Sequence, residues 1–433
     1  MANSLTRMDS YVYNALIGGA FPLFLIYYGA NRLLKGKYRE SAPYRLGLRF
    51  AEFGKPSKGS IWIHALSVGE TMAAIPLVKA IKETRPVDTI VFSTSTETGQ
   101  KTAQKNLRDY VSRFFYMPHD FSWAIRKVVS TLSPRIFLTI ETDAWPNLLT
   151  FLRLNGIPAF LVNGRISPKS LKRFLMVQNF SKRLFQSFEM CMVQSSNDAG
   201  KLVKLGLDAG KVRNTGNLKF DMLPSVSAEE KESLARELGL KRDDKVWVAG
   251  STHGGEEEII IDVFRFMETR IPGLKLVLVP RHPDRAARVK DMVVKKGLNC
   301  SLRSTNKGFG TTAKVLVVDT LGELARLYSL AIVAFIGGSL VPVGGHNPLE
   351  ALAFGVPVVF GKYMFNFKEI EELLLDANCA LKVTDKKNMA AAMIDLFEEP
   401  DRLKQMGSNA QRVILQNRGA TKRVIETITP YLR

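Results

Sequence analysis

Two kinds of residue in this sequence could do chemistry together: carboxylates that follow apolar runs, and glycines that precede a helical pattern. The longest such stretch is 335–361, FIGGSLVPVGGHNPLEALAFGVPVVFG, in which an apolar run ends in paired glycines and a second pair follows at Gly344 and Gly345. Glycines let a backbone approach a ligand closely, and free N–H groups at a helix start suit a phosphate. The pattern predicts strand, glycine loop, helix and strand, with the helix opening at Asn347 or Pro348.

Glu350 lies in the first turn of this predicted helix. Its carboxylate could accept hydrogen bonds from a ribose diol, or it could only complement the positive end of the helix dipole. The position of Glu350 in the helix, taken alone, favours the helix-dipole role. A ribose contact is expected only if other motifs of the chain also indicate a nucleotide site.

Two further motifs place carboxylates after apolar runs in the first half of the chain. HALSVGE (64–70) contains Ser67 and Glu70 at the spacing of a capping box, which is a structural interpretation of Glu70. Pro76 in the same pattern predicts that the helix begins later or kinks there. ETDAWPN (141–147) follows the run 136–140, where a parallel sheet places its ligand sites, but it could also be a polar loop that caps a helix near Pro146.

Small hydroxyls and a guanidinium follow two apolar runs in the second half. In AGSTHGGEEE (249–258) the hydroxyls of Ser251 and Thr252 could hold phosphate, and an ordinary N-cap is an equal alternative for Thr252. In VPRHPDR (279–285) Arg281 could bind phosphate through two parallel hydrogen bonds, while His282 could contact a base or only cap the loop.

Length and composition limit the class of protein. A chain of 433 residues is too long for one ordinary core, and 46% hydrophobic residues indicate a folded chain. The net charge of +20 is spread without dense Lys/Arg tracts, which favours a phosphorylated substrate at an anionic membrane surface over nucleic acid. Three distant cysteines and five scattered histidines form no metal motif, so no bound catalytic metal is expected.

Apolar runs alternate with helical patterns twice along the chain, which predicts two doubly wound α/β domains joined near 221–228. No GxGxxG follows the first run of either domain, and no P-loop motif occurs. The predicted strands of the first domain are 61–66, 89–92, 114–117, 136–140, 158–162 and 190–193, and those of the second are 246–249, 276–279, 315–318, 332–336, 356–360 and 380–383.

Two segments are candidates for membrane contact. Residues 11–30 form an uncharged apolar run followed by basic residues, which predicts a single anchor helix with the bulk of the chain in the cytoplasm, or a helix lying in one leaflet. Residues 169–188 mix basic and apolar side chains and could dock on an anionic bilayer, or form an ordinary amphipathic helix.

The stretch GGSLVPVGGHNPLEALAFGVPVVFG resembles the nucleotide-binding signature of Kdo transferases, which move 3-deoxy-D-manno-oct-2-ulosonic acid (Kdo) from its CMP-activated form to lipid A precursors. The resemblance runs through five ordered motifs between about 37 and 397. It implies the GT-B fold, two Rossmann-like domains facing a cleft. The implied parts are a membrane anchor (1–36), an acceptor-binding domain (37–222), a nucleotide-binding domain (223–415) and a final helix returning to the first domain (416–433).

The resemblance assigns roles to individual residues. Glu70 matches the proposed general base, Glu141 begins a motif that usually reads ETE, and Lys219 matches a lysine thought to stabilise the transition state. Asp143 departs from the family as a shortened substitute for glutamate. The implied nucleotide site comprises Ser251, Thr252, Pro280, Arg281, His282, Leu321, Gly322, Glu323, Gly345, His346, Asn347, Pro348, Leu349 and Glu350. The acceptor or sugar candidates are Ser67, Gly69, Thr96, Asp143 and Arg165.

The implied activity is an inverting, metal-independent transfer of Kdo to a phosphorylated lipid A precursor (lipid IVA) in lipopolysaccharide inner-core synthesis. CMP-Kdo would be the donor substrate with no further cofactor, and the enzyme would work at the cytoplasmic face of the bacterial inner membrane without binding nucleic acid. Two alternatives remain open at this point. One is another GT-B transferase that uses a UDP-sugar, and the other is a non-catalytic, membrane-anchored binding protein that exploits the charge of +20.

Overall fold

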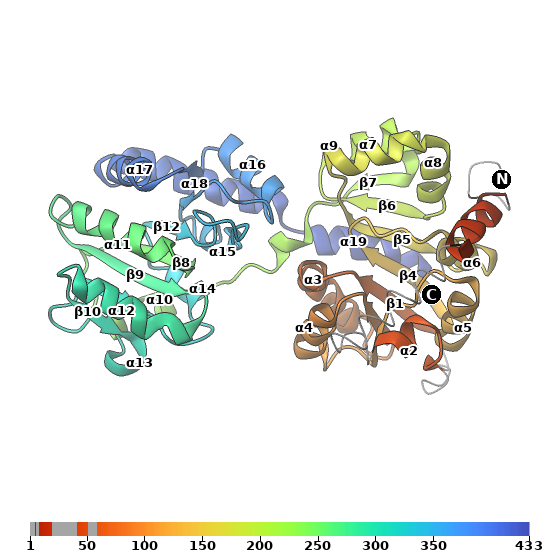
Figure 1. Ribbon diagram of the computed structural model, residues 1–433, viewed down its shortest axis with the longest axis horizontal. Helices are drawn as coiled ribbons and strands as arrows, with labels where there is room; N and C mark the ends of the chain where they lie inside the picture. The colour runs from red at the N-terminus through yellow and green to blue at the C-terminus, as the bar shows by residue number, and fades with distance from the viewer. Residues whose placement is uncertain (1–4, 6–7, 20–40, 51–58, 433) are drawn as a thin grey trace. The chain divides into compact units, whose positions relative to one another are not determined.

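The computed structural model describes residues 5, 8–19, 41–50 and 59–432. The chain divides into two compact units, 1–222 with 417–433, and 223–416. Each unit holds a parallel sheet with helices on both sides (Figure 1). The expectation of two doubly wound domains is therefore confirmed. The predicted anchor, 11–30, falls partly outside the described residues.

The sheet of unit 1 has seven parallel strands in the order β3-β2-β1-β4-β5-β6-β7. Six of them match the predicted apolar runs to within a few residues, and the seventh, β7, was not predicted because its side chains are half-buried or exposed. The strands are β1 Ser60–Ala65, β2 Thr89–Thr94, β3 Arg113–Tyr116, β4 Pro134–Ile140, β5 Ala159–Gly164, β6 Met190–Val193 and β7 Val212–Asn214.

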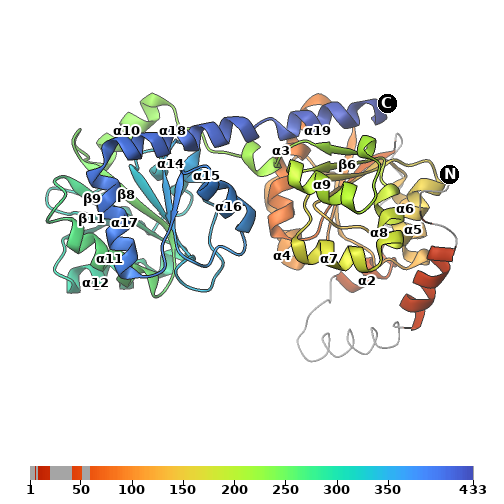
Figure 2. The ribbon, with the colours of Figure 1, turned by 90° about the horizontal axis from the view of Figure 1, so that it is seen from above.

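Helices cover both faces of this sheet and bury two separate apolar clusters. α3, α4 and α19 pack on one face, and α5, α6, α8 and α9 pack on the other. The final helix α19 lies against α3, and its Val424 and Ile428 are fully buried (Figure 2). The helices of unit 1 are α2 Ser41–Arg45, α3 Val68–Thr84, α4 Glu97–Leu107, α5 Ser122–Leu132, α6 Pro146–Leu154, α7 Pro168–Met176, α8 Gln178–Gln186, α9 Ser196–Lys204 and α19 Ala420–Ile428.

α3 runs through Pro76, so of the two predicted alternatives the later helix start is wrong, and the kink at Pro76 stays a prediction. Proline removes one backbone donor inside a helix. On either side of it, α3 buries Ala73, Ala74, Leu77 and Val78 against the sheet. Burial of this apolar face holds the helix together across the missing hydrogen bond.

The sheet of unit 2 also has seven parallel strands, in the order β10-β11-β9-β8-β12-β13-β14. The short strand β10 was not predicted. The strands are β8 Lys245–Thr252, β9 Leu274–Pro280, β10 Cys300–Leu302, β11 Val315–Val317, β12 Val333–Ile336, β13 Val358–Phe360 and β14 Ala380–Lys382, and the helices are α10 Ala228–Leu238, α11 Glu256–Met267, α12 Ala286–Lys295, α13 Arg303–Asn306, α14 Leu324–Tyr328, α15 Leu349–Leu352, α16 Lys368–Asp376, α17 Lys386–Glu398 and α18 Pro400–Asn417.

Residues 8–19 form a helix whose polar side contacts unit 1. Asp9 accepts two hydrogen bonds from Arg183, at 2.6 and 2.8 Å. The side-chain amides of Asn14 and Asn147 donate to each other, at 3.0 and 2.8 Å. In the part of the chain that the structure describes, no helix is both long and apolar enough to cross a bilayer.

The segment 169–188 folds as two helices, α7 and α8, and not as one amphipathic helix. Leu184 and Phe185 of α8 belong to the core of unit 1, whereas α7 buries no residue. Met176, at the end of α7, has an exposed fraction of 79%. The surface available for membrane contact in this segment is therefore α7 and the turn after it.

Candidate active site and nucleotide site

The carboxyl ends of β1 and β4 form the switch point of the unit 1 sheet, because the chain winds away from them in opposite directions. In open α/β sheets, ligands bind in the crevice outside the strand ends at this point. HALSVGE follows β1 and ETDAWPN follows β4, so the topology brings the two predicted carboxylate motifs together.

Glu70 lies in the first turn of α3, and its Oε2 accepts a hydrogen bond from the Ser67 backbone N–H at 2.5 Å. The pair forms the capping box that the spacing predicts. Burial raises the pKa of Glu70, and the negative charge of Glu141 raises it further. A carboxylate with a raised pKa is a stronger base than an exposed one, so the capping residue can also act as a general base.

Glu141 adopts a left-handed backbone conformation, with φ of 62°. A non-glycine residue in this region is strained, at a cost of order 1 kcal/mol or more, and such residues cluster at functional sites. The conformation places the Glu141 carboxylate 3.9 Å from the Nζ of Lys219. Lys219 lies in a short 3-10 helix, Leu218–Asp221, where the Leu218 N–H donates to Asn163 Oδ1 at 2.9 Å.

His64 is a site residue to which the sequence analysis gave no role. It is fully buried in β1, and its Nε2 lies 3.0 Å from Asp143 Oδ2. Its Nδ1 lies 2.9 Å from Ser93 Oγ and 3.1 Å from the Ser93 carbonyl oxygen, and the same Oγ accepts a hydrogen bond from Trp62 Nε1 at 2.8 Å. A carboxylate oxygen accepts, so Nε2 of His64 donates its hydrogen to Asp143. Asp143 is held in place although its side chain is one methylene shorter than glutamate.

The remaining acceptor candidates lie on loops of the same unit. Thr96 caps α4, its hydroxyl accepting from the Gly99 N–H at 3.0 Å. A Cβ on Gly99 would lie 3.3 Å from the backbone of Ser67, so this loop adjoins the start of α3 near Gly69. The backbone N–H of Arg165 donates to the Thr142 hydroxyl at 3.1 Å, which joins its loop to ETDAWPN.

In unit 2 the switch point lies between β8 and β12. Ser251, at the end of β8, has φ of 55°. Gly337, just after β12, has to be glycine because an added Cβ would lie 2.2 Å from the Ser251 carbonyl oxygen. Thr252 is fully buried, and its hydroxyl donates to Glu257 at 3.2 Å. The Thr252 hydroxyl is thus occupied within the fold, and Ser251 is the partly exposed residue of this pair.

Three histidines and an arginine gather around these loops. His253 Nε2 and His346 Nε2 lie 2.8 Å apart, and their rings are stacked. The ring of His282 lies edge-on to His253. Burial lowers the pKa of His346 to about 4, and the positive charge of Arg281 adds to this effect. His346 is neutral at pH 7, while the exposed Arg281, directly after Pro280, supplies positive charge.

The loops 319–323 and 344–350 complete the predicted set. Gly345 has φ of 77°, and a Cβ there would lie 2.3 Å from Met364 Sδ. The helix after it, α15, begins at Leu349, later than predicted and with Pro348 as its cap; the Asn347 side chain accepts from the Leu349 N–H at 3.2 Å. Burial raises the pKa of Glu350.

Glu323 has a partner within the fold, because it forms an ion pair with Arg303 at 2.8 Å. Leu321, two residues earlier, is 82% exposed, and Gly322 has φ of 88°. The backbone and Leu321 are therefore the parts of this loop that face outward. Among the described residues, no cluster of three His, Cys, Asp or Glu side chains could hold a metal ion.

Comparison with known proteins identifies the family. Residues 41–222 match the family model described as "3-Deoxy-D-manno-octulosonic-acid transferase (kdotransferase)", and residues 258–413 match "Glycosyl transferases group 1". The 3-deoxy-D-manno-octulosonic acid transferase of Haemophilus influenzae is 34% identical over 98% of this chain and 99% of its own. The chain belongs to the Kdo transferase family. The corresponding enzyme of Bordetella pertussis is 31% identical over 97% of this chain and 99% of its own.

Solved structures support the fold assignment of this Kdo transferase. The UDP-GlcNAc 2-epimerase of Neisseria meningitidis aligns with a TM-score of 0.57 over 86% of this chain and all of its own, at 12% identity. Identity this low shows the fold alone. The family makes the chain a glycosyltransferase, which excludes the non-catalytic alternative, and the shared fold is that of the GT-B class.

The structure groups the predicted residues of this Kdo transferase into two sets. Glu70, Glu141, Asp143 and Lys219 gather within unit 1, and the loops after β8, β9, β11 and β12 gather at the strand ends of unit 2. The first set offers a base and a cation, and the second offers an arginine, hydroxyls and buried carboxylates. The signal that could have identified His64 is its register: it pairs with Ser93 on the neighbouring strand.

Proposed function

We propose that this Kdo transferase uses CMP-Kdo as donor and a phosphorylated lipid A precursor, lipid IVA, as acceptor, with inversion at the anomeric carbon. The observation that carries the proposal is the Glu70, Glu141 and Lys219 cluster at the switch point of unit 1. A base of raised pKa next to a second carboxylate and a lysine suits the deprotonation of an acceptor hydroxyl beside anionic groups.

In the proposed reaction, Glu70 takes the proton of the acceptor hydroxyl as its oxygen attacks the anomeric carbon of Kdo. The bond between that carbon and the phosphate oxygen breaks, and CMP leaves with the electron pair. Attack from the face opposite the leaving group inverts the anomeric centre. Lys219 stabilises the developing negative charge, so the reaction needs no metal ion.

Unit 2 would bind the CMP moiety. Arg281 carries the charge for the phosphate, and Glu350 would accept from the ribose hydroxyls. Ser251, His282 and the backbone around Gly322 and Gly345 would complete the site. The second candidate donor is a UDP-sugar. It is considered because the Neisseria meningitidis epimerase, which has the same fold, binds UDP-GlcNAc.

The decisive experiment incubates the full chain with CMP-Kdo and tetra-acylated lipid A precursor and measures the lipid products by mass spectrometry. Products heavier by one or more Kdo residues, formed equally in EDTA, support the proposal. A product formed from a UDP-sugar, or tighter calorimetric binding of UMP than of CMP, would favour the second donor. Loss of transfer in EDTA that Mg²⁺ restores would contradict metal independence.

We further propose that the helix 8–19 and α5 contact an anionic membrane surface. Met8, Tyr11 and Leu16 are exposed by 71%, 71% and 69% on the side of this helix that does not contact unit 1. The Ser122 hydroxyl, at the start of α5, donates to Asn14 at 3.1 Å, so the two elements are neighbours. A helix with one apolar face and one fixed polar face suits the boundary between headgroups and acyl chains.

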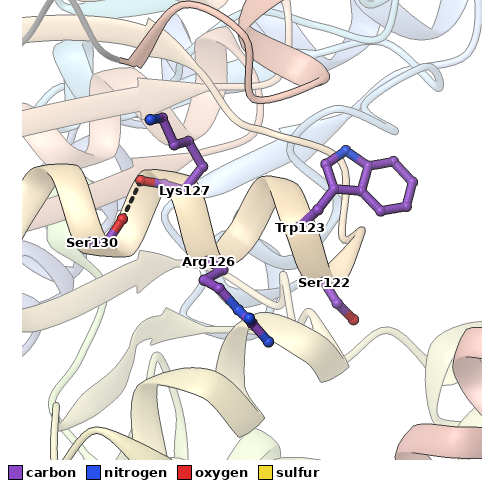
Figure 3. A pocket seen from close by; sticks show the side chains of 5 residues that line it. All are labelled: Ser122, Trp123, Arg126, Lys127 and Ser130. Atoms are coloured by element: carbon purple, nitrogen blue, oxygen red, sulfur yellow. Dashed lines mark hydrogen bonds between the residues drawn. The ribbon is translucent and has the colours of Figure 1, made fainter.

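The adjoining surface of α5 adds an aromatic ring and positive charge. Trp123 is 54% exposed and stacks on Phe121 with ring centroids 4.5 Å apart. With Arg126 and Lys127 it lines a shallow hollow on the helix (Figure 3). Tryptophan prefers the membrane interface, and each basic residue near an anionic surface contributes about 1 kcal/mol.

A truncation tests this proposal. Removal of residues 1–34 should reduce binding to anionic vesicles, and the remaining binding should be lost at high salt because it is electrostatic. The change Trp123→Ala in the full chain should weaken vesicle binding without lowering transfer to detergent-dispersed acceptor. A truncated protein that binds vesicles as tightly as the full chain would contradict the role of the helix 8–19.

A further inference from the structure

α11 opens with three consecutive glutamates in very different surroundings. Glu256 and Glu257 are fully buried, whereas the side chain of Glu258 is 67% exposed. A buried carboxylate is costly unless it is paired or fully hydrogen-bonded. Glu257 has a cation as partner, because Arg285 donates to it at 2.7 and 3.2 Å.

Glu256 is held instead by four backbone N–H groups. Its Oε2 accepts from Gly338 at 2.7 Å and from His253 at 2.9 Å, and its Oε1 accepts from Ser339 and Leu340, both at 2.9 Å. Three of these donors, 338–340, are consecutive residues that follow β12 after Gly337. Converging N–H groups of successive residues form a nest, which in other proteins binds an anion such as phosphate.

The chain held by Glu256 leads directly into the nucleotide loop. The Gly338 carbonyl accepts from the N–H groups of Gly344 and Gly345, at 3.1 and 2.8 Å. The Ser339 hydroxyl accepts from the Gly361 N–H at 2.7 Å, which ties the same turn to the residue directly after β13. The positions of His346 and Glu350 therefore depend on the turn 338–340. The N–H groups of this turn all donate to the Glu256 carboxylate.

We propose that Glu256 is a positioning residue of the donor site: its carboxylate fills the nest at 338–340 and fixes the loop that presents residues 345–350 to the nucleotide. This inference rests on the proposed donor site in unit 2. It also means that the three N–H groups are occupied by the protein itself. The donor phosphate is bound by other groups of the site, Arg281 among them.

The variant Glu256→Gln tests this role, with Glu258→Gln as the matched control on the same helix. Glutamine keeps the size of the side chain but turns an NH₂ group toward two N–H donors, which cannot hydrogen-bond to it. In Glu256→Gln, hydrogen exchange should become at least tenfold faster at 338–340 and stay unchanged in β12. CMP binding should weaken at least tenfold, and the KM for the acceptor should stay unchanged. The control should match the wild type in all three.

A second variant covers the case in which Glu256→Gln does not fold. Glu256→Asp keeps the charge but withdraws it by about 1.5 Å. It should show faster exchange at 338–340 and CMP binding between those of the wild type and of Glu256→Gln. A folded variant of either kind with wild-type exchange, or with faster exchange and CMP affinity within threefold of wild type, would overturn the inference. Failure of the wild type itself to bind CMP would instead refute the proposed donor site, and the exchange measurement distinguishes the two results.

Discussion

The substitution Glu70→Gln separates the two roles of this residue, helix cap and general base. Glutamine at this position can still accept from the Ser67 N–H, because capping boxes use Glu or Gln alike. The melting temperature should therefore remain close to that of the wild type. Glutamine cannot take a proton from the acceptor, so turnover should fall by roughly 10²- to 10⁴-fold.

Two variants complete the experiment. Glu70→Ala removes cap and base together, so it should lose the same activity and in addition about 1 kcal/mol of stability. Glu83→Gln, an exposed glutamate near the other end of α3, controls for the loss of a negative charge. The assay follows Kdo transfer by mass spectrometry and CMP binding by calorimetry, which should be unchanged because the nucleotide belongs to unit 2. If Glu70→Gln retained turnover within about threefold of wild type, the base would have to be another residue.

Three further predictions follow from charged groups, two at the candidate sites and one at the buried Asp120 before α5. In Glu141→Gln, the acidic limb of the pH–rate profile should move to lower pH, because the charge that helps to raise the pKa of Glu70 is gone; an unmoved limb would mean that Glu70 is not the titrating base. Arg281→Ala and Glu350→Ala should each weaken CMP binding by about 1.5 to 3 kcal/mol in calorimetric titrations, and unchanged affinity in both would place the nucleotide elsewhere. Burial raises the pKa of Asp120 from 3.8 to about 7. Between these two pH values the carboxyl is protonated in the folded state and ionised in the unfolded state. The free energy of unfolding should therefore fall as the pH rises through this range, by at most ~4 kcal/mol. Urea unfolding at pH 5 and pH 8 measures this, and Asp120→Asn should flatten the difference; a flat profile in the wild type would contradict the shifted pKa.

Periodicity predicted the sheets because parallel strands buried on both faces are continuous apolar runs. Met190–Val193 was predicted to the residue. β7 and β10 were missed because neither is a continuous apolar run: β7 includes the exposed Arg213 and Asn214, and β10 reads Cys-Ser-Leu. Each is a strand because its backbone pairs with one neighbouring strand, and the order of apolar residues in the sequence does not show this pairing.

The site was predictable where a motif carries its own chemistry, and not where a contact joins distant segments. Arg281 was predicted because it directly follows an apolar run, whereas the spacing of Glu70 indicates a capping box and only the family resemblance assigned it as the base. The role of His64 was missed because a single histidine inside a strand indicates no function in the sequence. Only the structure shows its contact with Asp143. Glu256 was missed for the same reason, since a glutamate in the first turn of a helix is an ordinary sequence feature. Its four partners come from two loops more than 80 residues apart.

The helix α19 makes unit 1 depend on a segment that is synthesised after unit 2. Val424 and Ile428 belong to the core beside α3, yet about 200 residues of unit 2 are made between them and the rest of unit 1. On the ribosome, unit 2 can complete its sheet as it emerges, whereas the rest of unit 1 keeps an open apolar face until α19 has also been made. A premature stop codon after residue 416 would therefore leave unit 2 able to fold, whereas unit 1 would lack α19 and part of its core.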